Sequence, residues 1–322
     1  MKLKFKSVIA VFFCVLVAHS AMAAATLTPA DLLSAGRVDD AVRTLNLRVQ
    51  TNPSDAESYH LLSRAYFHLK KWDQAISFGE RAVQLNPTKS SYYMWLGRAY
   101  GEKADDSSFI TAAGLTKKIR VNFERAVELD ANNVAARTDL AEFYIEAPGF
   151  MGGGLDKAAT QAQQISPLDP AKAHWVNARI AEKKKDPATA EREYFAAIKV
   201  SPTADYWLNL ASFYRRQDRL NDMENAVVKA MSSDMQQSNS LYDAATLLNR
   251  AGRNLPGAAS YVRKYLSLPT QNEEAPAFEA HYVLGTILEK EGDRNGAANE
   301  FRASLALAGD YKPAQEALKR IS

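Results

Sequence analysis

Catalysis or metal binding would require side chains such as histidine to converge, so the histidines are the first residues to weigh. Four of the five follow the N-terminal segment: His60, His68, His174 and His281. They are dispersed along the chain, and none belongs to a His-Glu-x-x-His spacing that could hold zinc. His60 and His68 share a predicted helix but lie about two turns apart, too far to bind one ion together. The sequence therefore predicts no metal site.

Nucleophiles and phosphate loops are also missing from the pattern. The only cysteine is Cys14, and no Gly-x-Ser-x-Gly elbow exists. The glycine-rich stretch 147–154 is followed by Leu155-Asp156-Lys157, whereas a phosphate loop needs Gly-Lys-Ser/Thr opening a helix after a strand. We therefore expect no catalytic residue, no cofactor and no small-molecule substrate, and we predict that the protein is not an enzyme.

The elements that could position side chains follow a fixed repeat. Leu62 and Leu96 are 34 residues apart, and so are Tyr66 and Tyr100. The same spacing separates Ala41 from Ala75 and Pro53 from Pro87. A period of this length is typical of helical repeat proteins.

Each period contains two amphipathic helices. Tyr59, Leu62 and Tyr66 lie at i, i+3 and i+7 and form one apolar stripe, and Ala75, Phe78 and Ala82 form the next. Pro87 then ends the second helix. One such hairpin cannot bury its own stripe, so neighbouring hairpins must stack.

This pattern resembles the tetratricopeptide repeat family, whose motif combines an aromatic residue, Leu-Gly, Tyr, Ala, an aromatic, Ala and a closing Pro. Residues 56–89 fit it best, through Tyr59, Leu62, Tyr66, Ala75, Ala82 and Pro87. The resemblance implies an all-α, right-handed α-solenoid that occupies residues 24–322 as a single domain. Further repeats are expected at about 24–55, 90–132, 133–170, 171–203, 204–237, 238–272 and 278–309, with a C-terminal capping helix over 310–322.

Two stretches break the period. Residues 101–118 add about ten residues to the second repeat, and residues 147–154 interrupt the third repeat between its two helices. Glycines in the second stretch allow a tight loop. We interpret both as structural insertions.

The resemblance also implies a binding surface, because relatives line a concave groove with fixed positions of each first helix. The corresponding candidates for protein binding are His60, Arg64, Phe67, Met94, Arg98, Trp175, Arg179, Arg215, Tyr242 and Tyr282. Arginine beside aromatic surface is typical of binding hot spots. A groove that is positive and partly apolar is expected to bind an acidic segment with apolar anchors. The alternative is that these are ordinary solvated helix residues.

The N-terminus has the features of a secretory signal peptide. Lys2, Lys4 and Lys6 precede an apolar run over 8–18, which is short for a membrane span, and Ala21 and Ala23 offer small residues for cleavage. A retained membrane helix is the alternative. The full chain carries a formal charge of +3, so removal of three lysines leaves it near neutral. A neutral chain is not expected to bind nucleic acid.

These observations favour an exported, periplasmic or secreted scaffold that binds a protein or peptide in its groove. The alternative is a structural component of a cell-envelope assembly that contacts its neighbours through the convex face or the inserted loops. Such a component would occur in a stoichiometric complex.

Cleavage near Ala23 is the first testable prediction. Protein isolated from the cell envelope should have the intact mass of residues 24–322, because signal peptidase removes the segment before that point. Mass spectrometry of the whole protein checks this, and a mass that retains Met1 to Ala23 would contradict it.

Overall fold

The computed structural model describes residues 27–232, 238–269 and 271–322. The proposed signal peptide and its cleavage site lie outside the described residues. The described part consists of α-helices, one 3-10 turn and connecting loops, without a strand. This confirms the predicted all-α fold. None of the described helices is both long and apolar enough to cross a membrane.

The helices follow one another in antiparallel pairs. Those of the first half are α1 (Pro29–Ser34), α2 (Val38–Thr51), α3 (Ala56–His68), α4 (Trp72–Leu85), α5 (Ser90–Asp105), α6 (Phe109–Leu129), α7 (Val134–Glu146), the 3-10 turn η1 (Gly149–Met151) and α8 (Leu155–Ile165). Those of the second half are α9 (Pro170–Lys183), α10 (Pro187–Val200), α11 (Ala204–Arg216), α12 (Leu220–Met231), α13 (Ser238–Ala251), α14 (Leu255–Leu266), α15 (Ala277–Lys290), α16 (Arg294–Leu307) and α17 (Lys312–Ile321).

Short polar residues decide where many helices begin. The side chain of Asp55 accepts a hydrogen bond from the backbone N–H of Ser58 at 3.2 Å, and Asn133 accepts one from that of Ala136 at 3.0 Å. Asp169 caps α9 in the same way, immediately before Pro170 at the first helical position. These caps satisfy amides that have no partner inside the helix, so the start of each of these helices is determined locally.

Small residues let the paired helices approach each other. Ala75 and Ala82 are both fully buried, as expected for a helix crossing. Gly97 lies under the ring of Phe123, and Gly285 lies in the same way under Phe301. A Cβ at either glycine would stand 2.5 Å from an aromatic carbon, so only glycine permits this packing.

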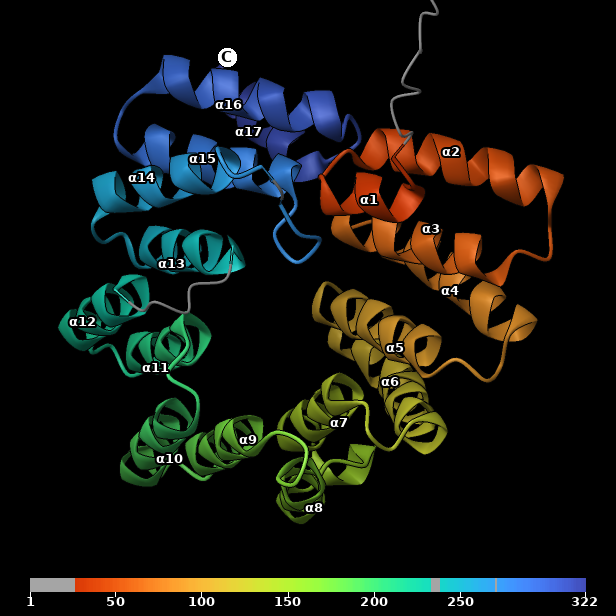
Figure 1. Cartoon of the computed structure of the whole chain (residues 1–322), viewed down its shortest axis with the longest axis vertical. Helices are drawn as coiled ribbons and strands as arrows, with labels where there is room; N and C mark the ends of the chain where they lie inside the picture. Colours follow the sequence, from red (N-terminus) through yellow and green to blue (C-terminus); the bar gives the residue numbers. More distant parts are fainter. Residues whose placement is uncertain (1–26, 233–237, 270) are drawn as a thin grey trace, which may run out of the picture.

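Stacked pairs curve into a ring (Figure 1). In this view α7, α9, α11 and α13 form the inner wall, and α8, α10 and α12 form the outer one. The curvature continues until α1–α3 lie beside α15–α17. We call the concave side of the ring, which the inner helices face, the lumen.

An apolar contact closes the ring. Leu33 and Leu45 of the first repeat belong to one buried cluster with Phe278, Tyr311 and Ala314 of the last repeat and its terminal helix. The loop between α1 and α2 adds a close approach of backbone to backbone, because a Cβ at Gly36 would stand 2.4 Å from the nitrogen of Ala277. The terminal helix α17 packs on α16, as expected for a cap, and its Ala314 also meets the first repeat.

Polar contacts surround this joint. The carboxylate of Asp39 accepts a hydrogen bond from the backbone N–H of Gly309 at 2.8 Å. Lys71 forms an ion pair with Asp310 at 2.5 Å. On the inner wall, Arg64 of α3 forms an ion pair with Glu273, which lies in the connection between α14 and α15.

The two insertions have different structures. Residues 101–118 lengthen α5 and above all α6, which at 21 residues is longer than any other described helix. Residues 147–154 form η1 and a loop that contacts α6. The insertions, which are separate in sequence, therefore meet in space.

The packing under Phe123 gives a testable prediction within one helix. Gly97→Ala should lower the free energy of unfolding by ~1–3 kcal/mol, because the new methyl group overpacks the contact with Phe123. Gly101→Ala, one turn further along α5, meets open space and should leave stability unchanged or raise it by up to about 1 kcal/mol through helix propensity. Urea unfolding of both variants checks the sign of each change, and equal effects would contradict this packing.

Candidate protein-binding surface inside the ring

Two of the predicted groove residues are buried between repeats. His60 is 3% exposed, and its ring stacks on Tyr92 with 4.5 Å between centroids. Burial and the nearby charge of Arg64 lower the pKa of His60 to about 3, so this imidazole is neutral at pH 7. Met94 packs against Ala126 and Ala136. His60 and Met94 occupy the same position in successive repeats, and that position faces the neighbouring repeat instead of the lumen.

Three other predicted residues surround Trp95, which is not among the candidate binding residues expected from the sequence. The guanidinium carbons of Arg64 and Arg98 lie 5.1 and 5.0 Å from the centre of its ring system, within cation–π range. Phe67 meets Trp95 edge to face at 5.3 Å. The sequence signal for Trp95 is its position directly after the buried Met94 and three residues before the recurrent Arg98.

Arg64 is held at the closing joint of the ring. Its Nε donates to Oε1 of Glu273 at 2.7 Å, and its Nη2 donates to Oε2. His68, one turn further along α3, lies 3.3 Å from the same carboxylate and 3.5 Å from that of Glu279. Burial alone would lower the pKa of His68, but hydrogen bonds and charges of both carboxylates outweigh it and raise this pKa to about 9. The charged imidazole and Arg64 therefore share Glu273.

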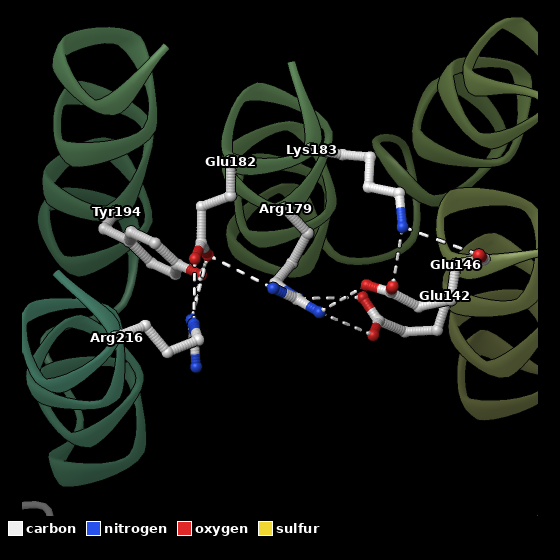
Figure 2. Close-up of polar contacts among 7 residues, drawn as sticks. All are labelled: Glu142, Glu146, Arg179, Glu182, Lys183, Tyr194 and Arg216. Atoms are coloured by element: carbon white, nitrogen blue, oxygen red, sulfur yellow. Dashed lines mark hydrogen bonds and ion pairs between the residues drawn. The ribbon is translucent and has the colours of Figure 1, made fainter. Parts of the chain in front are cut away.

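The remaining recurrent arginines are paired across the inner wall. Arg98 of α5 bonds to Asp139 of α7 at 2.6 Å. Figure 2 shows the next step, in which Arg179 of α9 reaches Glu142 and Glu146 of α7, both at 3.1 Å. These ion pairs link the inner helices of successive repeats.

Glu182 lies at the centre of the cluster in Figure 2. It accepts hydrogen bonds from Arg179 at 3.3 Å, from Arg216 of α11 at 2.8 Å and from the hydroxyl of Tyr194 at 2.6 Å. Lys183 pairs separately with Glu146 at 2.8 Å. One carboxylate with 8% of its side chain exposed therefore joins three helices.

These pairs correct the expected charge of the groove. The sequence alone predicts a positive patch from Arg64, Arg98 and Arg179. Each of these three guanidinium groups instead meets at least one carboxylate of another inner-wall segment. The patch is neutralised because acidic residues occupy the facing positions of the neighbouring helix or loop.

A largely apolar cavity of about 780 Å³ opens beside Trp95, between α5 and α7 and over α6. We call it the aromatic cavity; its apolar lining includes Phe67, Trp95, Phe109, Phe123, Phe143 and Met151. Glu102 and Asp105 also line it, and neither forms an ion pair within the described part of the chain. Desolvation by the cavity walls, together with the charge of Asp105, raises the pKa of Glu102 above its usual value. The edge of this cavity is therefore acidic.

Arg215 and Tyr242 line a second cavity of about 530 Å³ between α11 and α13, which we call the polar cavity. Asp243 also lines it, and enclosure by the surrounding walls together with the charges of Asp205 and Glu274 raises the pKa of Asp243 to about 7. The Nε of Arg215 is buried without a hydrogen-bond partner. Glu274 lines both cavities, so they adjoin at this residue.

The last two predicted residues line neither cavity. Trp175 packs on the core of the second half and carries the ammonium group of Lys172 at 5.0 Å from its ring centre. Tyr282 lies between Phe301 and Tyr311, at 5.9 and 5.6 Å between ring centroids. Within the described ranges, no group of three or more histidines, cysteines or carboxylates could hold a metal ion.

The role of Glu182 gives a pH-dependent prediction. Burial on its own raises the pKa of Glu182, but hydrogen bonds from Arg216 and Tyr194 outweigh it and hold this pKa below the usual range. At pH 7, Glu182→Gln should therefore lower the free energy of unfolding by ~1–2 kcal/mol, as expected for a lost charged hydrogen-bond acceptor. The difference from the wild type should be complete above the ordinary glutamate pKa of about 4.5 and should fade as the pH drops below it.

Asp73→Asn is the matched control for this measurement. Asp73 pairs with Lys103 but has 84% of its side chain exposed, so its loss should change stability by less than about 0.5 kcal/mol. Urea unfolding between pH 3 and pH 7 checks both variants. An effect of Glu182→Gln that is the same at every pH would contradict the role of an ionised Glu182 in joining the three helices.

Comparison with known proteins agrees with this architecture. Residues 56–89 match the family model described as Tetratricopeptide repeat. The crystal structure of yeast Tom70 is 15% identical, with a TM-score of 0.53 over 88% of this chain and 58% of that one. A thermophilic TPR protein of Thermus thermophilus is 20% identical, with a TM-score of 0.48 over 57% of this chain and 96% of that one. A search of curated proteins by sequence gives no match. The chain thus has the all-α solenoid fold of tetratricopeptide repeat proteins, and its residues 56–89 are a tetratricopeptide repeat.

Proposed function

We propose that the protein is an exported scaffold that binds an extended segment of a partner protein on the inner wall of its ring. The observation that supports this most strongly is the aromatic cavity, whose lining combines Phe67, Trp95 and Phe143 on three successive inner helices. Aromatic side chains in a concave site bury a large apolar area at little cost in conformational entropy. Such a cavity suits an apolar anchor residue of a partner.

The charges around the lumen define the rest of the partner segment. Glu102 and Asp105 at the aromatic cavity are unpaired in the described structure, while Arg98 and Arg179 are already neutralised by carboxylates of the ring. Desolvation and the charge of Asp105 together raise the pKa of Glu102, so the two carboxylates repel each other. A basic side chain next to the apolar anchor would relieve that repulsion. The proposed ligand is therefore an apolar residue flanked by lysine or arginine.

Access to the lumen depends on the closing joint. A partner whose segment lies within its chain must either thread the ring or part the contact between the first and last repeats. The ion pair of Arg64 and Glu273 stands at that joint on the inner wall. Its separation would free the guanidinium group beside Trp95 at the moment when a partner enters.

A structural role in an envelope assembly is the second candidate. The observation in its favour is that large apolar side chains on the two insertions are exposed, Phe109 and Phe150 among them. The two roles differ in the surface that contacts the partner. The assembly role uses the edge of the ring, whereas the scaffold role uses its lumen.

Luminal binding is tested with a partner recovered by pulldown from envelope extract. Trp95→Ala should weaken its binding at least tenfold in calorimetry, since truncation of an aromatic hot spot costs ~2 kcal/mol or more. The double variant Glu102→Lys/Asp105→Lys should also weaken binding, and its residues are exposed, so its stability should match the wild type.

The control is Val228→Ala on the outer helix α12, where the side chain is exposed. Thermal melting of every variant separates lost binding from lost folding. If the luminal variants bind the partner as the wild type does, the lumen is not the binding surface. A partner that instead responds to Ile110→Ser and Phe150→Ser supports the assembly role.

A further inference from the structure

The two insertions together build an edge of the ring, part of which also walls the aromatic cavity. The Oγ1 atom of Thr116 in α6 lies 3.7 Å from the sulfur of Met151 in η1. Between α6 and the loop lies a cavity of about 410 Å³, lined by Ala113, Thr116, Lys117, Arg120 and residues 149–152. We call this region, with Phe109 and Ile110 on the first turn of α6, the docking edge.

Large apolar side chains project from the docking edge. Ile110 and Phe150 are each 84% exposed, and Phe109 is 75% exposed. Among the described residues the next most exposed large apolar side chain is Leu47, at 60%. Exposure of this degree at three side chains from two converging segments is unusual for the surface of a soluble domain and marks an interaction site.

The loop holds Phe150 outward by specific contacts. The backbone N–H of Gly154 donates to the carbonyl of Tyr144 at 2.8 Å, and Lys157 donates to the carbonyl of Gly152 at 3.0 Å. At Gly153 a Cβ would stand 1.8 Å from the carbonyl oxygen of Ala147, so glycine is required there. The exposure of Phe150 is therefore built into the loop.

Lys117 and Arg120 bring positive charge to the cavity that Phe150 also lines. Neither Lys117 nor Arg120 forms an ion pair in the part of the chain that the structure describes, and the Nε of Arg120 is buried without a hydrogen-bond partner. The arginines Arg64, Arg98 and Arg179 on the inner wall, in contrast, all meet carboxylates. An unpaired guanidinium group in a cavity fits an anion supplied from outside.

We propose that the docking edge binds the surface of an anionic phospholipid bilayer. A headgroup phosphate would occupy the cavity at Lys117 and Arg120, while Phe109, Ile110 and Phe150 enter the boundary of headgroups and acyl chains. Cations with apolar side chains projecting beyond them are the arrangement that peripheral membrane anchors use. A groove for an acidic peptide would instead have its apolar side chains along the walls, where the peptide could cover them.

Vesicle flotation tests the proposal with the full chain. The wild type should bind vesicles of phosphatidylglycerol and phosphatidylcholine at least tenfold more tightly than vesicles of phosphatidylcholine alone, and rising salt should weaken this binding. The triple variant Phe109→Ser/Ile110→Ser/Phe150→Ser should lose at least tenfold in affinity. Lys117→Gln/Arg120→Gln should remove the preference for the anionic lipid.

The matched control is Leu47→Ser/Val228→Ser, which removes two exposed apolar side chains elsewhere on the ring and should bind vesicles as the wild type does. Trp95→Ala should do so too, which separates this proposal from luminal binding. Equal binding of the triple variant and the wild type overturns the proposal. So does a wild type that ignores vesicles while Ile110→Ser/Phe150→Ser loses a soluble protein partner, because the docking edge is then a protein interface.

Discussion

The contact between the first and last repeats is the constraint on which the rest of this structure depends. A solenoid is stabilised between neighbouring repeats, so its two ends ordinarily remain exposed and require polar caps. Here Leu45 of the first repeat and Phe278 and Tyr311 near the C-terminus share one buried cluster, which covers both ends at once. Closure also fixes the total curvature, since each stacked pair must turn by the amount that brings Gly36 against Ala277. The shape of the lumen is therefore set by all the repeats together.

Curvature explains the charge pattern of the inner wall. Side chains on the concave side of a ring converge, so long charged groups on successive inner helices come within contact distance. Arg98 reaches Asp139, Arg179 reaches Glu142, and Arg216 reaches Glu182, each pair joining one repeat to the next. Figure 2 shows the second and third of these pairs. Exposed pairs of this kind contribute little one by one, but Glu182 is nearly buried and joins three helices. These ion pairs between successive inner helices thus restrain the curvature that brings the paired side chains together.

The 34-residue spacing was sufficient to predict the helices and their pairing, because it reports on contacts between neighbouring repeats. It contains no information on closure, which depends on partners such as Arg64 and Glu273 that are 209 residues apart. The recurrence predicts arginines at one position of successive first helices but not their carboxylate partners, because ion pairs between repeats leave no local pattern. His60 and Met94 were assigned to the groove although they pack between repeats. The family resemblance points to Met94 and Arg98 as groove positions, and not to Trp95 between them.

The insertions connect the two surfaces of the ring. Phe109 and Met151 line the aromatic cavity, while their chain neighbours Ile110 and Phe150 are exposed at the docking edge. The same first turns of α6 therefore form part of the cavity wall and part of the edge. Any contact that shifts α6 must also reshape the cavity, because a packed helix moves as a unit. A ring held by this edge would keep the aromatic cavity next to the surface that holds it.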